Sequence, residues 1–137
     1  MPGDVFVDTN ILVYAYDTAA GSKHEAAKRL VAELWHTDPW PAISVQVLQE
    51  LFVNLHRLGV PLADVRARVQ DFAQWHVVEN TVALVEEGIA EVERWQVSFW
   101  DGLILAAARR AGVATVWSED LNDGQAYDGL RVTNPLK

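Results

Sequence analysis

The sequence predicts an α/β domain in which helices cover both faces of a central parallel sheet of about five short strands. Short runs of β-branched and aromatic residues alternate with longer amphipathic segments, which is the pattern of strand–helix–strand units. No repeat or low-complexity linker interrupts the 137 residues, so we predict a single domain over residues 1–137. Hydrophobic residues make up 50% of the chain, which is enough to build a buried core at this length.

Charge and cysteine content exclude several classes of protein. Lys and Arg number 11 against 19 Asp and Glu, and the net charge of −8 has the wrong sign for binding nucleic acid by bulk electrostatics. The chain has no Cys, which excludes disulfides and Cys-based zinc sites. The longest apolar runs, Ile11–Tyr16 and Leu103–Ala108, are far shorter than a membrane span of about 20 residues. Because no basic signal segment is visible at the start, we expect a cytoplasmic protein that does not contact membranes.

The chain begins with a predicted strand followed by two helices. Asp4–Asp8 is a β-branched and aromatic run that ends abruptly in polar residues, as a buried strand does at a loop. Ile11–Tyr16 is short and apolar, and we expect a helix there. Ser22 and Glu25 have capping-box spacing at the start of a second helix, which runs to about Trp35.

The middle of the chain predicts two strands and two helices. Pro41–Ile43 is a short strand, and Ser44 is the N-cap of a helix whose apolar face continues until Gly59. Leu62–Trp75 has the spacing of a further helix. His76–Val78 is the third predicted strand.

A long helix follows the third strand. Thr81 opens this helix, which runs to about Gln96. The residues expected to face the core are Leu84, Val85, Ile89, Val92 and Trp95.

The last quarter of the chain predicts one helix and two strands. Ser98 and Asp101 have capping-box spacing and open a helix over Gly102–Ala111. Ala114–Trp117 and Leu130–Val132 are the fourth and fifth strands, with a loop rich in Asp, Asn and Gly between them.

Four acidic residues stand where an α/β sheet of this kind binds ligands, which is at the carboxyl ends of its strands. Asp8 ends the first strand, and Asp120 follows the fourth strand. Asp101 lies in the first turn of the helix that precedes the fourth strand, and Glu50 interrupts the apolar face of the Ser44 helix. A cluster of oxygen ligands of this kind suits Mg²⁺ or Mn²⁺.

Each of these acids also has an ordinary structural interpretation. Asp101, three residues after Ser98, fits the first turn of a helix. Glu50 fits a solvent-facing helix position, and Asp120 fits a polar turn. Asp8 fits the N-cap of the short helix that follows it. The joint placement of the four residues, and not any one of them, indicates a site.

Histidine and tryptophan carry less information. The four His show no metal-ligand spacing, and the six Trp are expected to pack in the core and between helices. For Trp40 and Trp100, stacking on a nucleic-acid base is the alternative to packing.

Four segments, in order and at similar spacing, resemble the motifs of PIN-domain ribonucleases, in particular the VapC-type toxins. The first is Val5–Tyr14 and the second is Ser44–Leu51. The third is Ser98–Ala108, and the fourth is Ser118–Gly124 with a tail over Val132–Pro135. The resemblance spans the whole chain.

The resemblance implies a PIN-like three-layer α/β/α fold and a metal-dependent endoribonuclease, the toxin of a type II toxin–antitoxin pair. Asp8, Asp101 and Asp120 would bind Mg²⁺ or Mn²⁺, and Glu50 would orient or deprotonate the water that attacks the phosphodiester bond. The supporting residues would be Thr9, Asn10, Asn122 and Asp123. The implied partners are an RNA substrate, a cognate antitoxin protein and a second copy of the chain in a homodimer.

Two positions depart from the family pattern. Gly102 stands where relatives usually carry Ala, which is expected to cost the helix up to about 1 kcal/mol. Asn122 stands where many relatives have a second Asp, and whether the neighbouring Asp123 takes that role is open.

Two other functions stay open from the residues alone. A phosphoacceptor or phosphatase-like site on a flavodoxin-like fold also places an Asp after a short parallel strand. The phosphoacceptor version needs a Lys near that Asp, but the chain has only Lys23, Lys28 and Lys137, none at a strand end. A haloacid-dehalogenase-type phosphatase has a second Asp where this chain has Asn10. The other alternative is a catalytically inactive PIN binding module, against which the intact acids argue.

Overall fold

The computed structural model describes residues 4–137, so the first three residues of the predicted domain lie outside the described residues. Its strands are β1 (Val5–Val7), β2 (Ala42–Ser44), β3 (His76–Val78), β4 (Thr115–Trp117), β5 (Ala126–Tyr127) and β6 (Leu130–Thr133). They form one sheet in the order β3-β2-β1-β4-β6-β5, in which only the β5–β6 pair is antiparallel. The predicted parallel sheet is confirmed, and the two-residue edge strand β5 is its unpredicted addition.

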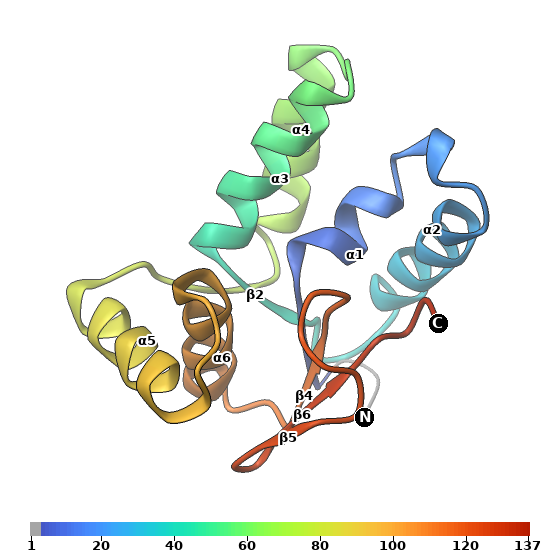
Figure 1. The fold of residues 1–137 in the computed structure, drawn as a ribbon. Helices are drawn as coiled ribbons and strands as arrows, with labels where there is room; N and C mark the ends of the chain where they lie inside the picture. The colour runs from blue at the N-terminus through green and yellow to red at the C-terminus, as the bar shows by residue number, and fades with distance from the viewer. Residues whose placement is uncertain (1–3) are drawn as a thin grey trace.

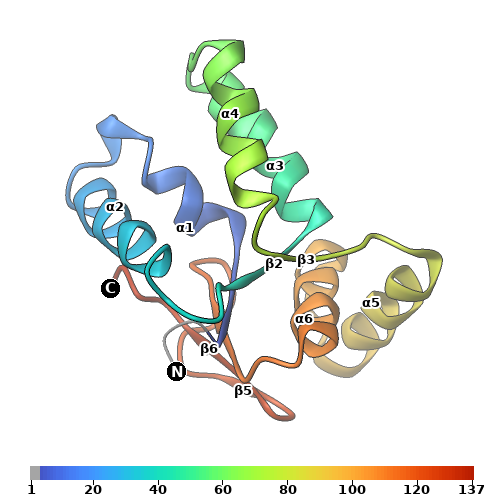
Figure 2. The ribbon, with the colours of Figure 1, turned by 180° about the vertical axis from the view of Figure 1, so that it is seen from behind.

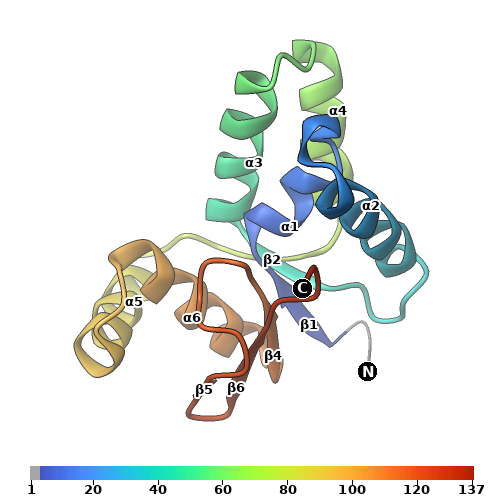
Figure 3. The same ribbon diagram turned by 45° about the vertical axis from the view of Figure 1, so that its right-hand side comes forward.

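The helices are α1 (Thr9–Tyr14), α2 (Ser22–Leu34), α3 (Val45–Arg57), α4 (Leu62–Phe72), α5 (Val82–Trp95) and α6 (Phe99–Ala111), with a 3₁₀ turn η1 (Thr18–Ala20). The α5–α6 pair lies on one side of the sheet and the α1–α2 pair on the other (Figures 1 and 2). The α3–α4 hairpin projects beyond the strand ends (Figure 3). The three-layer α/β/α prediction is therefore confirmed. Within residues 4–137, no helix has the length and apolar character needed to cross a membrane.

Strand β1 occupies the centre of the sheet, between β2 and β4. From β1 the chain first builds β2 and β3 on one side and later adds β4 and β6 on the other. A crevice forms where the order of a parallel sheet reverses in this way. The first residue after β1 is Asp8, whose N–H donates to the carbonyl of Trp117 at 2.9 Å and so extends the pairing with β4.

The core explains why the sequence folds in this way. The side chains of Phe6, Ile43 and Val116 in the central strands are fully buried. Every residue of α6 from Gly102 to Ala108 is buried, because this helix packs against the sheet and against α5 at once. A helix that is apolar on all sides is expected in such a place.

Three of the predicted N-caps are confirmed by their hydrogen bonds. Ser44 accepts from the N–H of Val47, Thr81 accepts from that of Leu84, and Ser98 accepts from that of Asp101, at 3.3, 3.1 and 3.1 Å. The cap predicted at Ser22 is wrong, since Ser22 is the first residue inside α2. There the N-cap is Gly21, which makes no side-chain cap bond.

The predicted inner face of α5 is wrong at one position. Ile89 is exposed, while Gly88 and Glu91 are buried against α6. Both oxygens of Glu91 accept from the Arg109 guanidinium of α6 at 2.9 Å, and Glu91 Oε1 also accepts from Trp95 Nε1 at 3.0 Å. Because the charge is fully paired, Glu91 is buried although it was not among the residues expected to face the core.

The unusual Gly102 permits α5 and α6 to approach closely. A Cβ atom at Gly102 would lie 2.6 Å from the carbonyl oxygen of Gly88 and 2.9 Å from Val92 Cγ2. The carbonyl of Gly88 belongs to the backbone of α5, so it cannot move away from such a contact as the end of a flexible side chain could. The glycine that costs helix propensity is therefore required by the helix pair that carries Asp101.

Gly102→Ala is expected to destabilise the protein although alanine is the better helix former. Overpacking of this kind costs about 1–3 kcal/mol, which exceeds the propensity gain of up to about 1 kcal/mol. Urea unfolding of both proteins measures the difference. A Gly102→Ala variant more stable than wild type would show that the helices can separate without penalty.

Candidate active site

The centre of the candidate site is Asp8, which is only 4% exposed. Its carboxylate is the N-cap of α1, with Oδ1 accepting from the N–H of Thr9 at 2.7 Å. Its other oxygen, Oδ2, accepts from the hydroxyl of Ser118 at 2.7 Å. Ser118 directly follows β4, so the two parallel strand ends join at this carboxylate.

Burial raises the pKa of Asp8 to about 7, and the negative charges of Asp120 and Glu50 add to the rise. The hydrogen bonds from Ser118 and Thr9 act in the opposite direction and only partly offset it. A carboxyl group with its pKa this far from 3.8, in a crevice, is typical of a functional site.

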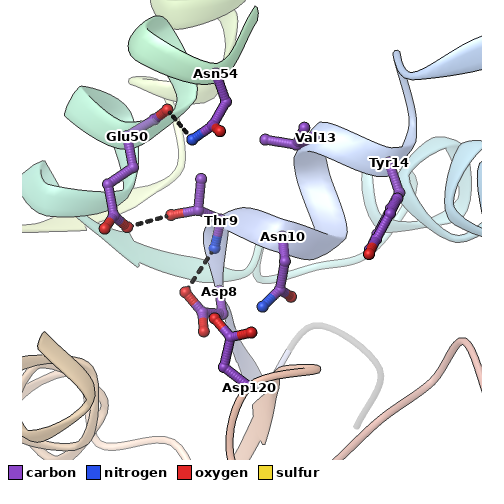
Figure 4. Close-up of a pocket in the computed structure, with 8 residues that line it drawn as sticks. All are labelled: Asp8, Thr9, Asn10, Val13, Tyr14, Glu50, Asn54 and Asp120. Carbon is purple, nitrogen blue, oxygen red and sulfur yellow. Dashed lines mark hydrogen bonds between the residues drawn. The ribbon is translucent and has the colours of Figure 1, made fainter. Parts of the chain in front are cut away.

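Thr9 connects Asp8 to Glu50. While its N–H donates to Asp8, its hydroxyl donates to Glu50 Oε1 at 2.7 Å (Figure 4). Glu50 lies on α3, and its backbone carbonyl accepts from the Asn54 side-chain amide at 2.8 Å. The acid that interrupts the apolar face of α3 therefore points to the end of β1.

Asp120 reaches the same place from the far side. Its N–H donates to the Ser118 hydroxyl oxygen at 3.1 Å, so Ser118 binds both Asp8 and Asp120. Figure 4 shows the Asp120 carboxylate beside that of Asp8. Three of the four predicted acids are thus brought together.

These groups line a pocket of about 300 Å³, which we call the acid pocket. Its lining residues are Asp8, Thr9, Asn10, Val13, Tyr14, Glu50, Asn54 and Asp120. None of them is Lys or Arg, and a phosphoacceptor site of the kind considered above lacks its required cation here.

Asp101 does not line the acid pocket, although it is electrostatically coupled to it. The residue is half-buried in the first turn of α6. Burial raises the pKa of Asp101, the charges of Asp120 and Glu50 raise it further, and a hydrogen bond with Ser98 opposes the rise. A plain helix cap far from other acids would not show this influence.

The two supporting residues of the fourth motif lie outside the pocket. Asn122 donates its side-chain amide to Gln125 Oε1 at 2.8 Å. Asp123 accepts from the N–H of Asn134 at 2.8 Å and lies 3.3 Å from Lys137 Nζ, contacts that lower its pKa. Both residues hold the loop and the C-terminal tail in place.

Asn10 is held between two networks. Its Oδ1 accepts from the N–H of Glu119 at 3.3 Å, while its buried Nδ2 has no partner among the described residues. Glu119 in turn accepts from Tyr14 Oη at 2.6 Å and pairs with Lys23 at 2.7 Å. This network forms the rim of the acid pocket on the α1 side.

Sequence reasoning did not single out Ser118, Asn54, Tyr14 or Glu119 as site residues. Ser118 and Glu119 were visible only as parts of the fourth motif. Asn54 could have been predicted from helical spacing, because it lies one turn after Glu50 on the same face of α3. Tyr14 was visible only as the last residue of the first motif.

The acids of the acid pocket offer only oxygen donors, which are the ligands that a divalent cation such as Mg²⁺ prefers. Among residues 4–137, no group of three or more Asp, Glu or His side chains is arranged to hold a metal ion. Mg²⁺ commonly binds one or two carboxylates and keeps several waters, so it does not require a closed cage. Asp8 and Asp120, which offer only oxygen ligands and repel each other, fit such an ion.

Comparison with known proteins adds a family and two similar structures. The sequence matches the family described as PIN domain over residues 5–125, a range that includes all four acids. The VapC20 structure from Mycobacterium tuberculosis, a sarcin-ricin loop cleaving toxin, is 27% identical with a TM-score of 0.66, over 85% of this chain and 91% of that one. A toxin–antitoxin complex from Klebsiella pneumoniae is 21% identical with a TM-score of 0.70, over 96% and 97%. No curated protein sequence matches the chain.

The raised pKa of Asp8 predicts that metal-free protein becomes less stable as the pH rises. Below pH 3.8 both states hold the proton, and between 3.8 and about 7 only the folded state does. Stability therefore falls across this window, by up to about 4 kcal/mol from this group, and stays low above it. Asp8→Asn is expected to remove most of the fall.

Urea unfolding in EDTA across this pH range measures the effect. Ser118→Ala is the matched variant of opposite sign, because it removes a hydrogen bond that lowers the pKa of Asp8 and so extends the fall to higher pH. Equal pH profiles for wild type and Asp8→Asn would contradict the assignment.

Proposed function

Because the chain belongs to the PIN domain family, we propose that it is a metal-dependent endoribonuclease that hydrolyses phosphodiester bonds in RNA. The observation that carries the proposal is the convergence of Asp8, Glu50 and Asp120 on one pocket at the central strand ends. A charged carboxylate in Asp8's buried position is unfavourable without a cation. A site that only stabilised the fold would not collect like charges.

Asp8 and Asp120, with Asp101 directly or through water, would hold Mg²⁺ or Mn²⁺. When bound, such an ion supplies positive charge to the scissile phosphate and makes a bound water more acidic. The ion also answers the objection raised by the net charge of −8, since it provides a local attraction for the phosphate.

Glu50 is the residue proposed to orient or deprotonate the attacking water. Oε1 is fixed by the Thr9 hydroxyl, and Oε2 has no hydrogen-bond partner among the described residues. The Thr9 hydroxyl thus occupies one carboxylate oxygen and leaves Oε2 to accept a proton from the attacking water. Thr9 therefore positions the base while its N–H orients Asp8.

We propose further that the protein is the toxin of a type II toxin–antitoxin pair and acts in the cytoplasm. The similarity to the VapC20 toxin structure supports the toxin role, and the similar fold of the solved toxin–antitoxin complex is compatible with an antitoxin partner. A homodimer is proposed from the same family resemblance. Expression in a bacterial host is expected to arrest growth, with rescue by the antitoxin encoded beside the gene.

Glu50→Gln tests the base. RNA cleavage by purified protein is expected to require Mg²⁺ or Mn²⁺ and to stop in EDTA. In Glu50→Gln its rate is expected to fall by about 10²- to 10⁴-fold, the usual contribution of a general base. Glu86→Gln, an exposed position on α5, is the matched control and keeps wild-type activity. Undiminished cleavage by Glu50→Gln would contradict the role as a base and would favour the interpretation of Glu50 as a solvent-facing helix residue.

The Asp101→Asn variant distinguishes two roles for Asp101, metal ligand or helix cap, because the two roles predict changes in stability of opposite sign. As a cap alone, Asp101 stabilises α6 by about 0.3–1 kcal/mol, and Asn lowers the melting temperature slightly with or without metal. As part of the acidic cluster, its charge is unfavourable in EDTA, so Asn leaves stability unchanged or higher. The Mg²⁺-dependent rise in melting temperature is then expected to shrink. Thermal melts of both proteins in EDTA and in Mg²⁺ decide between them.

A further inference from the structure

A second pocket of about 390 Å³ adjoins the acid pocket and has no role in the proposed chemistry. Its lining residues are Gln46, Gln49, Glu50, Val53, Asn54, Arg57 and Trp100. Glu50 and Asn54 line both pockets, so an occupant of this side pocket lies directly beside the acids. The side pocket is formed by α3 and the first turn of α6, which lie near each other in Figure 1.

Trp100 supplies a flat aromatic wall that is 61% exposed. Other tryptophans have clear packing roles: Trp35, Trp40 and Trp75 form an aromatic cluster with Phe72, and Trp95 packs against Tyr127. Trp100 has one aromatic neighbour, Phe99, at 5.2 Å in an edge contact. A large apolar ring left exposed beside a reactive pocket is suited to stacking on a ligand.

Gln46 supplies a polar side chain that makes no hydrogen bond to another described residue. The residue is only 7% exposed, in the first turn of α3, and lines the side pocket. No hydrogen bond among residues 4–137 involves its side-chain amide, and neither amide atom is among the buried atoms without a partner, so the amide is open to the side pocket. A carboxamide offers one acceptor and two donors in a plane, which matches the hydrogen-bonding edge of a nucleobase.

Arg57 completes the set as the cation among the residues that line the two pockets. It is exposed at the end of α3, and its guanidinium makes a long contact of 3.5 Å with Asn54 Oδ1. The side pocket thus combines an aromatic face, an unpaired amide and a positive charge. These are the groups that recognise the base and the phosphate of one nucleotide.

We infer that the side pocket binds one unpaired nucleobase of the RNA substrate, which stacks on Trp100, hydrogen-bonds to Gln46 and lies next to the scissile phosphate. The inference rests on the proposed nuclease function and names the substrate more closely. A paired base would first have to leave its stack and its partner, so the side pocket favours a base that is already unpaired.

The test compares the affinity for a single-stranded RNA with that for the same backbone in which every base is replaced by an abasic ribose. The protein is full-length Glu50→Gln with Mg²⁺, so that the RNA stays intact, and fluorescence anisotropy reports binding. The base-bearing RNA is expected to bind at least about tenfold more tightly. Adding Trp100→Ala is expected to reduce this preference by about fivefold to about 100-fold, and Trp100→Phe is expected to restore most of it.

Two matched controls lie outside the pocket. Phe52→Ala removes an aromatic ring that is 40% exposed on another face of α3, and Arg66→Ala removes an exposed positive charge on α4. Both are expected to keep the preference for bases. Gln46→Leu is expected to reduce the discrimination between different bases while leaving the stacking contribution.

The outcomes separate this inference from the proposed function. A preference for bases that is unchanged by Trp100→Ala, or no preference at all, overturns the side pocket as a base site even if wild-type protein cleaves RNA. A preference that depends on Trp100 upholds the base site. If wild-type protein then shows no metal-dependent cleavage, it is the nuclease proposal that fails.

Discussion

The active site depends on one constraint, the burial of the Asp8 carboxylate where the ends of β1 and β4 meet. Its N–H bonds to Trp117 of β4, so the backbone that carries it belongs to the sheet. Only two short hydrogen bonds, from Thr9 and Ser118, replace the water that the carboxylate loses. These bonds do not offset the burial, so the pKa of Asp8 stays raised to about 7. A cation beside Asp8 would therefore stabilise its ionised form.

The surrounding elements hold this unfavourable group in place. Thr9 links Asp8 to α3 through Glu50, and Ser118 links it to the loop that carries Asp120. On the other side, the close contact of Gly88 with Gly102 fixes the helix pair that carries Asp101. The stability lost at the acids is offset by the buried sheet and by α6, whose middle is apolar on all sides. Local strain at a site supported by a regular core is the usual compromise in enzymes.

Much of the fold was predictable, because strand patterns, caps and acid positions are local signals. Ser44, Thr81 and Ser98 all cap as their spacing indicates. One local signal failed, because the neighbouring Gly21 and not Ser22 is the N-cap of α2. The other failures arose where a distant partner decides the outcome. Glu91 is buried only because Arg109, 18 residues later, pairs with it. Likewise Ser118 reaches Asp8 across 110 positions of sequence, a pairing that no local pattern reveals.

The distribution of charge limits how this chain can recognise RNA. Six of the eleven Lys and Arg residues form ion pairs within residues 4–137: Lys23, Arg68, Arg94, Arg109, Arg110 and Lys137. Arg109 and Arg110, both in the last turn of α6, are committed to α5 acids and so do not line the acid pocket. Long-range attraction to a polyanion is therefore weak. In the site proposed above, affinity would come from short-range contacts, because the cation held by the acids would bind the phosphate and the exposed Trp100 ring would stack on a base. Such a division of roles would favour an exposed, unpaired target, where both contacts can form together.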